Sequence, residues 1–269
     1  MNGAAPLALV TGASAGIGAT FARALAARGY DLILVARRRE RLEALAGELE
    51  SRHGIRAEVL AADLADAAGL SSVEARIAAE PGLELLVNNA GFGITGRFWT
   101  TAAGEQERLH LLHVVATMRL THAALAGMVP RGHGAIVCVS SVAGFVQSPG
   151  SVTYNASKCW MNAFVEGLYL ELRSMRSPVR IQALCPGFTH SEFHDVAGID
   201  RATIAAQLWT SAEQVVEASL AGLERGALFV VPGWRYRLLV RLLAVTPASW
   251  RRALSVRYAR RMRRDRAAQ

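Results

Sequence analysis

The stretch P-L-A-L-V-T-G-A-S-A-G-I-G, residues 6–18, joins a short apolar run to three closely spaced glycines. Apolar residues then recur at helical spacing from Phe21 to Ala26, and Gly29 ends this pattern. A strand, a glycine loop and a helix in this order are the context that a phosphate-binding turn requires. The glycines let backbone N–H groups approach a pyrophosphate, and the helix N-terminus adds a favourable dipole. The spacing is G-x-x-x-G-x-G and not the commoner G-x-G-x-x-G, and it predicts a nucleotide site.

The rest of the chain alternates short apolar runs with helical patterns. Further strands are expected at residues 31–36, 57–62, 83–87, 135–141, 179–185 and 228–231, and helices near residues 42–49, 105–128, 153–175 and 212–225. This alternation predicts an α/β fold, a Rossmann-type doubly wound parallel sheet of about seven strands with helices on both faces. We expect residues 1–232 to form a single dinucleotide-binding and catalytic domain, followed by a basic amphipathic C-terminal extension over residues 233–269.

Charge is unevenly distributed along the 269 residues. The net charge is +8, but residues 233–269 hold eleven arginines and one acid, a net +10, which leaves the remainder at −2. A nucleic-acid-binding domain would carry its basic residues across a folded face, so this class is disfavoured. The three cysteines lack metal-like spacing and fit a reducing compartment. No signal peptide and no apolar run of about 18 residues is visible, which predicts a cytoplasmic protein.

Tyr154 and Lys158 are four residues apart, and both side chains would project from one face of a helix. A neighbouring ammonium favours the phenolate, lowers the pKa of tyrosine and suits it to proton transfer. Ser141, thirteen residues before Tyr154, would polarise a carbonyl oxygen. Lys158 is the only lysine beside 29 arginines, so a compact ammonium is kept only here. Taken alone, the pair also fits an exposed helical surface.

The end of the second expected strand indicates which dinucleotide binds. An acid there would hold the ribose 2′-OH of NAD, whereas an arginine accommodates the 2′-phosphate of NADP. Arg37 follows Ala36 at this place, so we predict NADP(H) in preference to NAD(H). The alternative is a solvated helix start, which fits Arg38 and Arg39 better than Arg37. Asp63 ends the third strand, where its carboxylate would face the adenine amino group.

Taken together and in order, these motifs resemble the short-chain dehydrogenase/reductase family. The matching segments are T-G-x-x-x-G-x-G from Thr11, N-N-A-G at residues 88–91, Ser141, Y-x-x-x-K from Tyr154, and P-G at residues 186–187. They span residues 11–191, about two thirds of the chain. As a set they are far more specific than any one of them alone.

The resemblance implies a role for each matching residue. Tyr154 would be the general acid or base, Lys158 would lower its pKa and bind the nicotinamide ribose, and Ser141 would position the substrate oxygen. Cofactor contacts are expected from Gly12, Ser14, Ala15, Gly16, Ile17, Gly18, Arg37, Asp63, Leu64, Asn89, Ala90, Gly91, Tyr154, Lys158, Pro186, Gly187, Phe188, Thr189 and Ser191. The resemblance also implies a homodimer or homotetramer. No metal is expected.

Two positions depart from the family pattern. His113 stands where members usually carry an asparagine that helps hold a water in a proton relay. The histidine would keep that water, relay protons itself or indicate weakened turnover. The alternative is that only the backbone carbonyl holds the water, so that the side chain is tolerated. Ser191 replaces the usual threonine after Pro-Gly and keeps the hydroxyl.

The loops expected around the nicotinamide are apolar. They carry Phe92, Ile94, Val142, Phe145, Phe188, Phe193, Val196 and Trp209, several of which could equally belong to the core. We expect Phe145 and Phe193 to contact the substrate with Ser141 and Tyr154. This wall favours a small apolar ketone, aldehyde or secondary alcohol over an acid or a sugar phosphate.

After Gly233, apolar residues alternate with arginines in a pattern that predicts two basic amphipathic helices. Such helices lie on anionic membrane surfaces, or their apolar faces cover the substrate cleft or a subunit interface. The sequence therefore predicts an NADP(H)-dependent oxidoreductase that transfers hydride reversibly between nicotinamide and an apolar carbonyl or alcohol. The alternatives are a membrane-associated lipid or acyl-chain ketoreductase and a nucleotide-binding scaffold with weakened catalysis.

Overall fold

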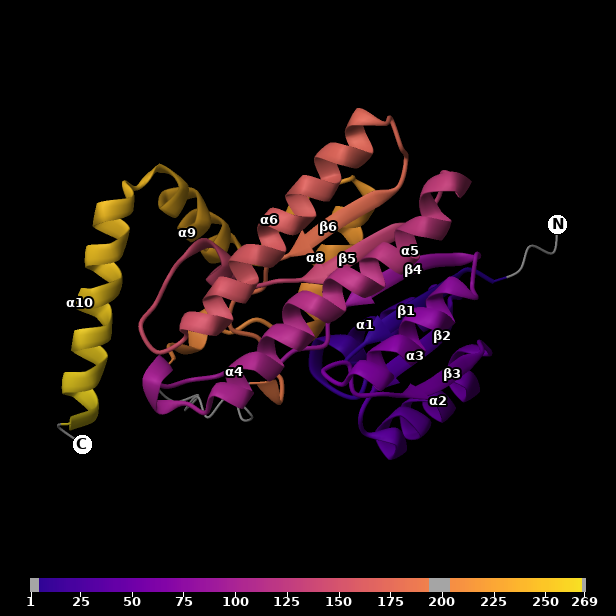
Figure 1. Ribbon diagram of the computed structural model, residues 1–269, viewed down its shortest axis with the longest axis horizontal. Helices are drawn as coiled ribbons and strands as arrows, with labels where there is room; N and C mark the ends of the chain where they lie inside the picture. The colour runs from indigo at the N-terminus through magenta and orange to yellow at the C-terminus, as the bar shows by residue number, and fades with distance from the viewer. Residues whose placement is uncertain (1–4, 194–203, 268–269) are drawn as a thin grey trace.

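The computed structural model describes residues 5–193 and 204–267. Its centre is a parallel sheet of seven strands in the order β3-β2-β1-β4-β5-β6-β7, which confirms the predicted fold class (Figure 1). The strands are β1 (Leu7–Thr11), β2 (Asp31–Ala36), β3 (Ala57–Ala61), β4 (Leu83–Asn88), β5 (Ala135–Val139), β6 (Arg180–Leu184) and β7 (Phe229–Val230). The order reverses between β1 and β4, where a doubly wound sheet places its ligand crevice.

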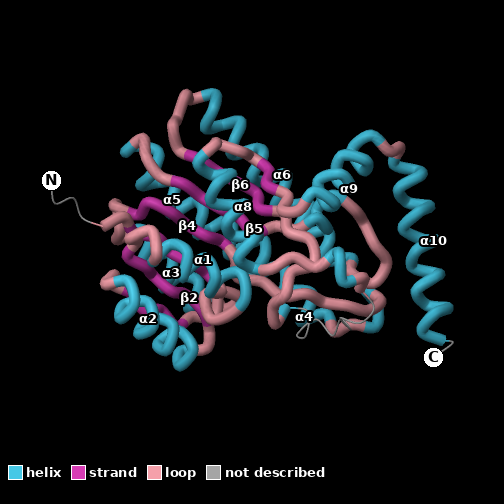
Figure 2. The backbone as a smooth tube through the Cα atoms, turned by 180° about the vertical axis from the view of Figure 1, so that it is seen from behind, coloured by secondary structure: helices cyan, strands magenta, loops and turns pink. Residues whose placement is uncertain are grey.

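Helices cover both faces of the sheet (Figure 2). They are α1 (Gly16–Ala26), α2 (Arg39–His53), α3 (Ala67–Ala78), α4 (Ala103–His110), α5 (Thr117–Arg131), α6 (Val152–Ser174) and α8 (Ala212–Glu224). Residues of β1 alternate between two separate cores: Ala8 and Val10 pack with α1, α2 and α8, whereas Leu9 packs with α3, α5 and α6. A strand buried on both faces explains why the opening stretch is apolar throughout.

The long helix expected near residues 105–128 is three consecutive segments. Between α4 and α5 lies a π-helical stretch, η2 (Leu111–Ala116). By length and composition, residues 103–131 are apolar enough to cross a membrane, but Ala116, Leu120, Ala124 and Met128 of this segment are buried in the core of the fold. This segment therefore packs as a core helix. Met118 is exposed, because it lies midway between the buried Ala116 and Leu120 and faces away from the sheet.

Two helices follow the last strand. They are α9 (Trp234–Val245) and α10 (Ala248–Ala267), and α10 stands away from the sheet in both views (Figures 1 and 2). Short 3-10 turns complete the described elements: η1 (Phe98–Thr100), η3 (Val142–Phe145) and η5 (Ala206–Leu208).

Candidate active site

The glycine turn between β1 and α1 is tightly packed from below. Gly12 and Gly16 adopt φ values of 67° and 53°, which L side chains rarely adopt. A Cβ on Gly18 would lie 2.3 Å from the carbonyl oxygen of Gly12. The N-cap residue of α1, Ala15, has no side chain to cap the helix, so the first N–H groups of α1 remain available to an anion. These features fit a pyrophosphate.

Asn88 and Asn89, at the end of β4, tie this strand to its neighbours. Asn89 Nδ2 donates to the Thr11 carbonyl oxygen at 2.8 Å, and its backbone N–H donates to Thr11 Oγ1 at 2.9 Å. Asn88 Nδ2 donates to Thr121 Oγ1 at 3.0 Å. Asn89 thus links β4 to β1 at the crevice, and the missing side chain of Gly91 makes room for His113, whose Nε2 would lie 2.7 Å from a Cβ there.

A single cavity of about 870 Å³ runs from the glycine turn to Tyr154. It is lined by Ser141 and by all of the predicted cofactor residues except Gly18, whose place is beneath the turn. Of the predicted apolar wall, Phe92, Ile94, Val142, Phe188 and Phe193 line it as well. Apolar residues that the sequence analysis did not assign to the wall complete it: Val146, Ile204, Ala205 and Leu208.

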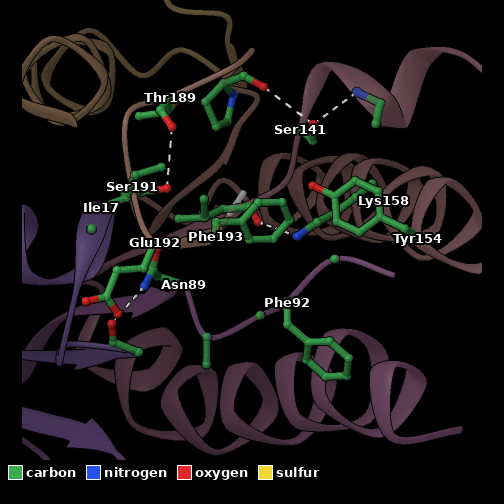
Figure 3. A pocket seen from close by; sticks show the side chains of 18 of the residues that line it. Ile17, Asn89, Phe92, Ser141, Tyr154, Lys158, Thr189, Ser191, Glu192 and Phe193 are labelled. Carbon is green, nitrogen blue, oxygen red and sulfur yellow. Dashed lines mark hydrogen bonds between the residues drawn. The ribbon is translucent and has the colours of Figure 1, made fainter. Parts of the chain in front are cut away.

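Two aromatic residues that were expected in the wall lie elsewhere. The 3-10 turn η3 directs Phe145 into the core, where its ring packs edge-on against Phe229 at 5.9 Å between centroids. Trp209 stacks on His190 at 4.7 Å. Val196 lies outside the described residues. The predicted contact between Phe145 and the substrate is therefore replaced by a core contact, whereas Phe193 lies 5.7 Å from the Tyr154 ring (Figure 3).

Three of the four predicted catalytic residues, Ser141, Tyr154 and Lys158, line the same part of the cavity (Figure 3). Tyr154 and Lys158 both come from the first turns of α6, and Lys158 Nζ lies 5.8 Å from the centroid of the Tyr154 ring. The ammonium donates to the carbonyl oxygen of Val139, at the end of β5, at 2.8 Å. Ser141 follows the same strand. Its Oγ accepts from the Ala143 N–H at 3.1 Å and donates to the Pro186 carbonyl oxygen at 3.4 Å.

Burial governs the protonation of this group. It lowers the pKa of Lys158 to about 8, because a buried ammonium loses its hydration. Burial raises the pKa of Tyr154 to about 12, and a hydrogen bond with Ser141 only partly offsets this. The lowered tyrosine pKa expected from spacing is thus absent from this geometry: Lys158 directs its ammonium at Val139, and desolvation outweighs its attraction for a phenolate.

Charged side chains gather at the opposite end, where the adenosine is expected and which is called the adenosine end below. Arg38 donates to Ser14 Oγ from Nη2 at 3.1 Å and pairs with Glu192 at 3.0 Å, and Arg41 also pairs with Glu192 at 2.6 Å. Arg37 lines the cavity beside Arg38. At the adenine position, Asp63 forms an ion pair with Arg108 of α4. Arg38 is therefore part of the site, although its position at a helix start suggested a solvated residue.

The family model for short chain dehydrogenases matches residues 6–201. This chain belongs to the short-chain dehydrogenase/reductase family. An uncharacterized oxidoreductase of Mycobacterium tuberculosis is 34% identical over 248 residues, which cover 89% of this chain and 93% of that protein. This short-chain dehydrogenase/reductase is accordingly an oxidoreductase.

Two solved structures of family members superpose over most of the chain. A short-chain dehydrogenase from Sphingobium yanoikuyae in complex with NADPH is 37% identical, with a TM-score of 0.81 over 90% of this chain and 97% of that one. The bulky-bulky ketone specific alcohol dehydrogenase from Comamonas testosteroni is 32% identical, with a TM-score of 0.78 over 90% of this chain and 95% of that one.

Within this family framework, His113 supports Tyr154 from behind. It is fully buried on η2, outside the cavity lining, and its ring packs edge-on against Tyr154 at 5.8 Å. Nε2 accepts from the Phe92 N–H at 3.2 Å, which assigns the ring proton to Nδ1 and makes Nδ1 the donor to Ser157 Oγ at 2.9 Å. Ser157 then donates to the Tyr154 carbonyl oxygen at 2.7 Å.

The environment keeps His113 neutral. Burial, followed by the nearby charge of Lys158, holds its pKa well below the usual range. Both ring nitrogens are engaged, so a proton relay through this side chain would first have to break one of these bonds. The structure therefore places His113 as a positioning group for Tyr154, and not as a residue of the cavity itself.

The loop at residues 186–193 connects the two ends of the family site. Its Ser191 packs against Gly16, where a Cβ would come within 2.9 Å of Ser191 Cβ. A Cβ on Gly187 would lie 2.0 Å from the Tyr236 ring of α9. Tyr236 Oη accepts from the Phe188 N–H at 3.1 Å and donates to the Leu208 carbonyl oxygen at 2.7 Å. Tyr236 was not predicted as a site residue, because in the sequence it is a single tyrosine within an arginine-rich segment.

Proposed function

We propose that this protein is an NADP(H)-dependent oxidoreductase that interconverts hydrophobic ketones or aldehydes with their alcohols, with Tyr154 as the acid or base. The observation that carries the proposal is that Ser141, Tyr154 and Lys158 line one cavity together with the glycine turn and the residues expected to hold a dinucleotide. A protein that only bound nucleotides would have no use for these three side chains together.

The reductive direction assigns one task to each side chain. A bound nicotinamide would supply hydride to the carbonyl carbon. Tyr154 gives its phenolic proton to the carbonyl oxygen, and Ser141 Oγ donates a hydrogen bond to the same oxygen as charge develops there. The Lys158 ammonium, held by Val139, stabilises the phenolate that remains. Its raised pKa keeps Tyr154 in the protonated form that reduction requires.

NADP(H) is favoured by the charges at the adenosine end. β2 ends at Ala36 without a carboxylate to hold a ribose 2′-OH, and both Arg37 and Arg38 line this part of the cavity. An arginine fork binds a phosphate through parallel charge-assisted hydrogen bonds. The NADPH complex of the Sphingobium yanoikuyae relative supports the same preference.

The walls near Tyr154 favour an apolar substrate. Of the described lining residues, only Lys158 is charged outside the adenosine end, and its ammonium is already bonded to the protein. Phe193 lies 5.7 Å from the Tyr154 ring between centroids, and Phe92 and Ile94 line the same cavity. The Comamonas testosteroni relative is described as specific for bulky-bulky ketones, which agrees with a wide apolar pocket. We therefore propose ketones with two sizeable apolar substituents.

A second candidate is an acyl-chain ketoreductase working at a membrane. It is favoured by the exposed apolar side chains of α9, which lies beside the loop at residues 186–193 that lines the pocket. The substrate screen below separates short ketones from acyl-chain substrates.

We also propose a cytoplasmic homo-oligomer. Exposed apolar residues such as Met118 and Leu170 lie on the long helices α5 and α6 and could form contacts between subunits.

The test is a fluorescence titration with NADPH and NADH on the parent protein and on Arg37→Ala, Arg38→Ala and Arg39→Ala. We expect NADPH to bind more tightly than NADH, and removal of Arg37 or Arg38 to weaken NADPH by at least about tenfold, one charge-assisted hydrogen bond. Arg39, which pairs with Glu43 at 3.6 Å, is the matched control and should change little.

Turnover is then followed as NADPH oxidation with apolar ketones of increasing bulk, a 3-oxoacyl thioester and an anionic keto acid. Reduction of the bulky ketones and rejection of the keto acid would support the proposal. Equal binding of both cofactors would contradict the NADP preference, and cofactor binding without turnover of any carbonyl would favour the scaffold interpretation.

A further inference from the structure

Helix α9 carries two apolar faces, of which the fold uses one. Tyr236, Val240 and Leu243 face the body of the protein and are buried or half-buried. On the opposite side, Trp234, Leu238, Leu242 and Val245 recur at spacings of four, four and three residues and form one exposed stripe. Val245 is 79% and Trp234 60% exposed. A soluble surface helix normally presents polar residues on this side, so the stripe requires an explanation.

Arginines border the outward stripe of α9. Helical spacing places Arg237 and Arg241 along one edge and Arg235 along the other. The ion pairs among the described residues leave out the arginines of α9, and the guanidinium of Arg235 lies over the Trp234 ring at 4.8 Å. An apolar stripe between cationic edges is the pattern of helices that lie in a lipid headgroup region.

The same pattern continues into α10. Trp250 and Leu254, four residues apart, are 67% and 58% exposed, and Arg251, Arg252, Arg257 and Arg260 accompany them. The helix extends away from the sheet with little of the body beside it (Figures 1 and 2). The turn η1, which precedes α4, exposes Phe98 and Trp99, the latter at 76%. Arg97 lies over Trp99 at 5.5 Å.

The outward stripe belongs to a helix that is held rigidly beside the catalytic pocket. Tyr236 is inserted against Gly187 and bonds to the Phe188 N–H and the Leu208 carbonyl oxygen. Phe188 and Leu208 both line the cavity. A surface that binds the stripe would therefore be separated from these two cavity-lining residues by the width of one helix.

We propose that α9 and the described part of α10 form a docking surface for membranes that contain anionic lipids. Charge decides between this partner and a second copy of the chain: residues 233–269 carry a net +10, so two such surfaces repel each other, and the remainder, at −2, offers little to attract them. A soluble polyanion would need the arginines but not the apolar stripe. A membrane uses both.

The experiment is sedimentation of the full-length protein with vesicles of phosphatidylcholine and phosphatidylglycerol, compared with phosphatidylcholine alone. We expect binding to the anionic vesicles, weakened by added salt, and at least about tenfold weaker binding for Leu238→Glu/Leu242→Glu. The matched control, Ala78→Glu/Met175→Glu, adds the same charge at two exposed apolar residues outside α9 and α10 and should bind as the parent does.

A second pair of variants separates the role of charge. Arg237→Gln/Arg241→Gln should reduce binding to anionic vesicles about tenfold, whereas Arg52→Gln/Arg225→Gln removes the same charge from exposed sites elsewhere and should have little effect. NADPH binding and the thermal unfolding midpoint of each variant verify that the fold is intact. Parent-like vesicle binding by the folded stripe variant would overturn the proposal.

Self-association is the competing result. The membrane proposal fails if the parent protein does not bind anionic vesicles and light scattering shows that Leu238→Glu/Leu242→Glu converts an oligomer into a monomer. In that case the stripe contacts a second copy of the chain. Vesicle binding needs neither cofactor nor turnover. Its failure would leave the proposed reductase function untouched, and failure of that function would leave the docking surface standing.

Discussion

At its adenosine end the cavity is bordered by exposed charged side chains that pair with one another, whereas at its catalytic end Lys158 is buried and its neighbours are aromatic. Charges at the first end are hydrated, so each contributes modestly and mainly to cofactor affinity. At the second end the same burial that shifts pKa values also makes each polar contact costly to lose. We therefore expect substitutions at the catalytic end to change turnover and protonation, and those at the adenosine end to change binding alone.

The largest effect should come from Tyr154→Phe, which removes the proton donor and keeps the ring. We expect the rate of ketone reduction to fall by about 10²- to 10⁴-fold, the usual contribution of a general acid, with NADPH affinity nearly unchanged. Steady-state kinetics and cofactor titration on one preparation measure both quantities. Substantial residual turnover would mean that another group delivers the proton and that the two ends do not differ in the way described.

Deprotonation of Lys158 should be visible in the dependence of the reaction rate on pH. Its pKa is lowered to about 8, so the ammonium is present below that pH and is lost as pH rises through it. Because the ammonium stabilises the phenolate, kcat for reduction should fall with a single-proton slope above pH of about 8. Lys158→Arg stays charged at every accessible pH, so its lower residual rate, reduced by roughly tenfold or more, should lack this limb. A parent profile that stays flat well above pH 8 would contradict the assignment.

The substitution His113→Phe tests whether the buried hydrogen bonds of His113 hold Tyr154 in position. The substitution keeps an aromatic ring against Tyr154 but leaves the Phe92 N–H and Ser157 Oγ without their partner. Loss of these buried hydrogen bonds should destabilise the fold by about 1–3 kcal/mol, measured by denaturant unfolding, and loosening of Tyr154 should lower kcat more than it changes KM.

The pH dependence distinguishes positioning from proton transfer by His113. Because its pKa is held well below the usual range, we expect no change in parent activity where an ordinary histidine titrates. If the parent activity did change in the pH range where an ordinary histidine titrates, and if this change were absent in His113→Phe, the ring itself would relay protons.

The sequence predicted what depends on short spacings. The glycine turn and the Tyr154–Lys158 pair follow from a strand end and one helical turn, since local geometry determines them. The parallel sheet of seven strands follows from the alternation of apolar runs and helices. The sequence did not predict how deeply individual side chains are buried. The raised pKa of Tyr154 and the turn of Phe145 into the core depend on packing that no spacing encodes.

Contacts between distant segments escaped the sequence for a related reason. Glu192 reaches Arg38 across 154 residues of chain, and Tyr236 reaches Phe188 across 48. Each partner alone is an ordinary surface acid, base or phenol, so no composition or period marks it. Both contacts involve the loop at residues 186–193, which was predicted only as a cofactor segment and is also what ties the adenosine end to α9.

The smallest effect, and the one specific to the adenosine end, should come from Glu192→Gln. The Glu192 carboxylate pairs with both Arg38 and Arg41, beside the place where Arg38 would meet a 2′-phosphate. The arginines hold the pKa of this carboxyl below its usual range, so it is ionised at neutral pH and competes with the phosphate for Arg38. Neutralising it should tighten NADPH binding by up to about fivefold, as expected for an exposed ion pair.

The discriminating comparison is the same titration with NADH, which has no 2′-phosphate and should be nearly unaffected. Glu43→Gln is the matched control, because it removes an exposed carboxylate that pairs with Arg39 on the same helix. Added salt should shrink the difference between Glu192→Gln and the parent, since screening weakens exposed pairs. Weaker NADPH binding by Glu192→Gln would mean that the carboxylate holds Arg38 in place for the phosphate and does not compete with it, and the adenosine end would then be as preorganised as the catalytic end.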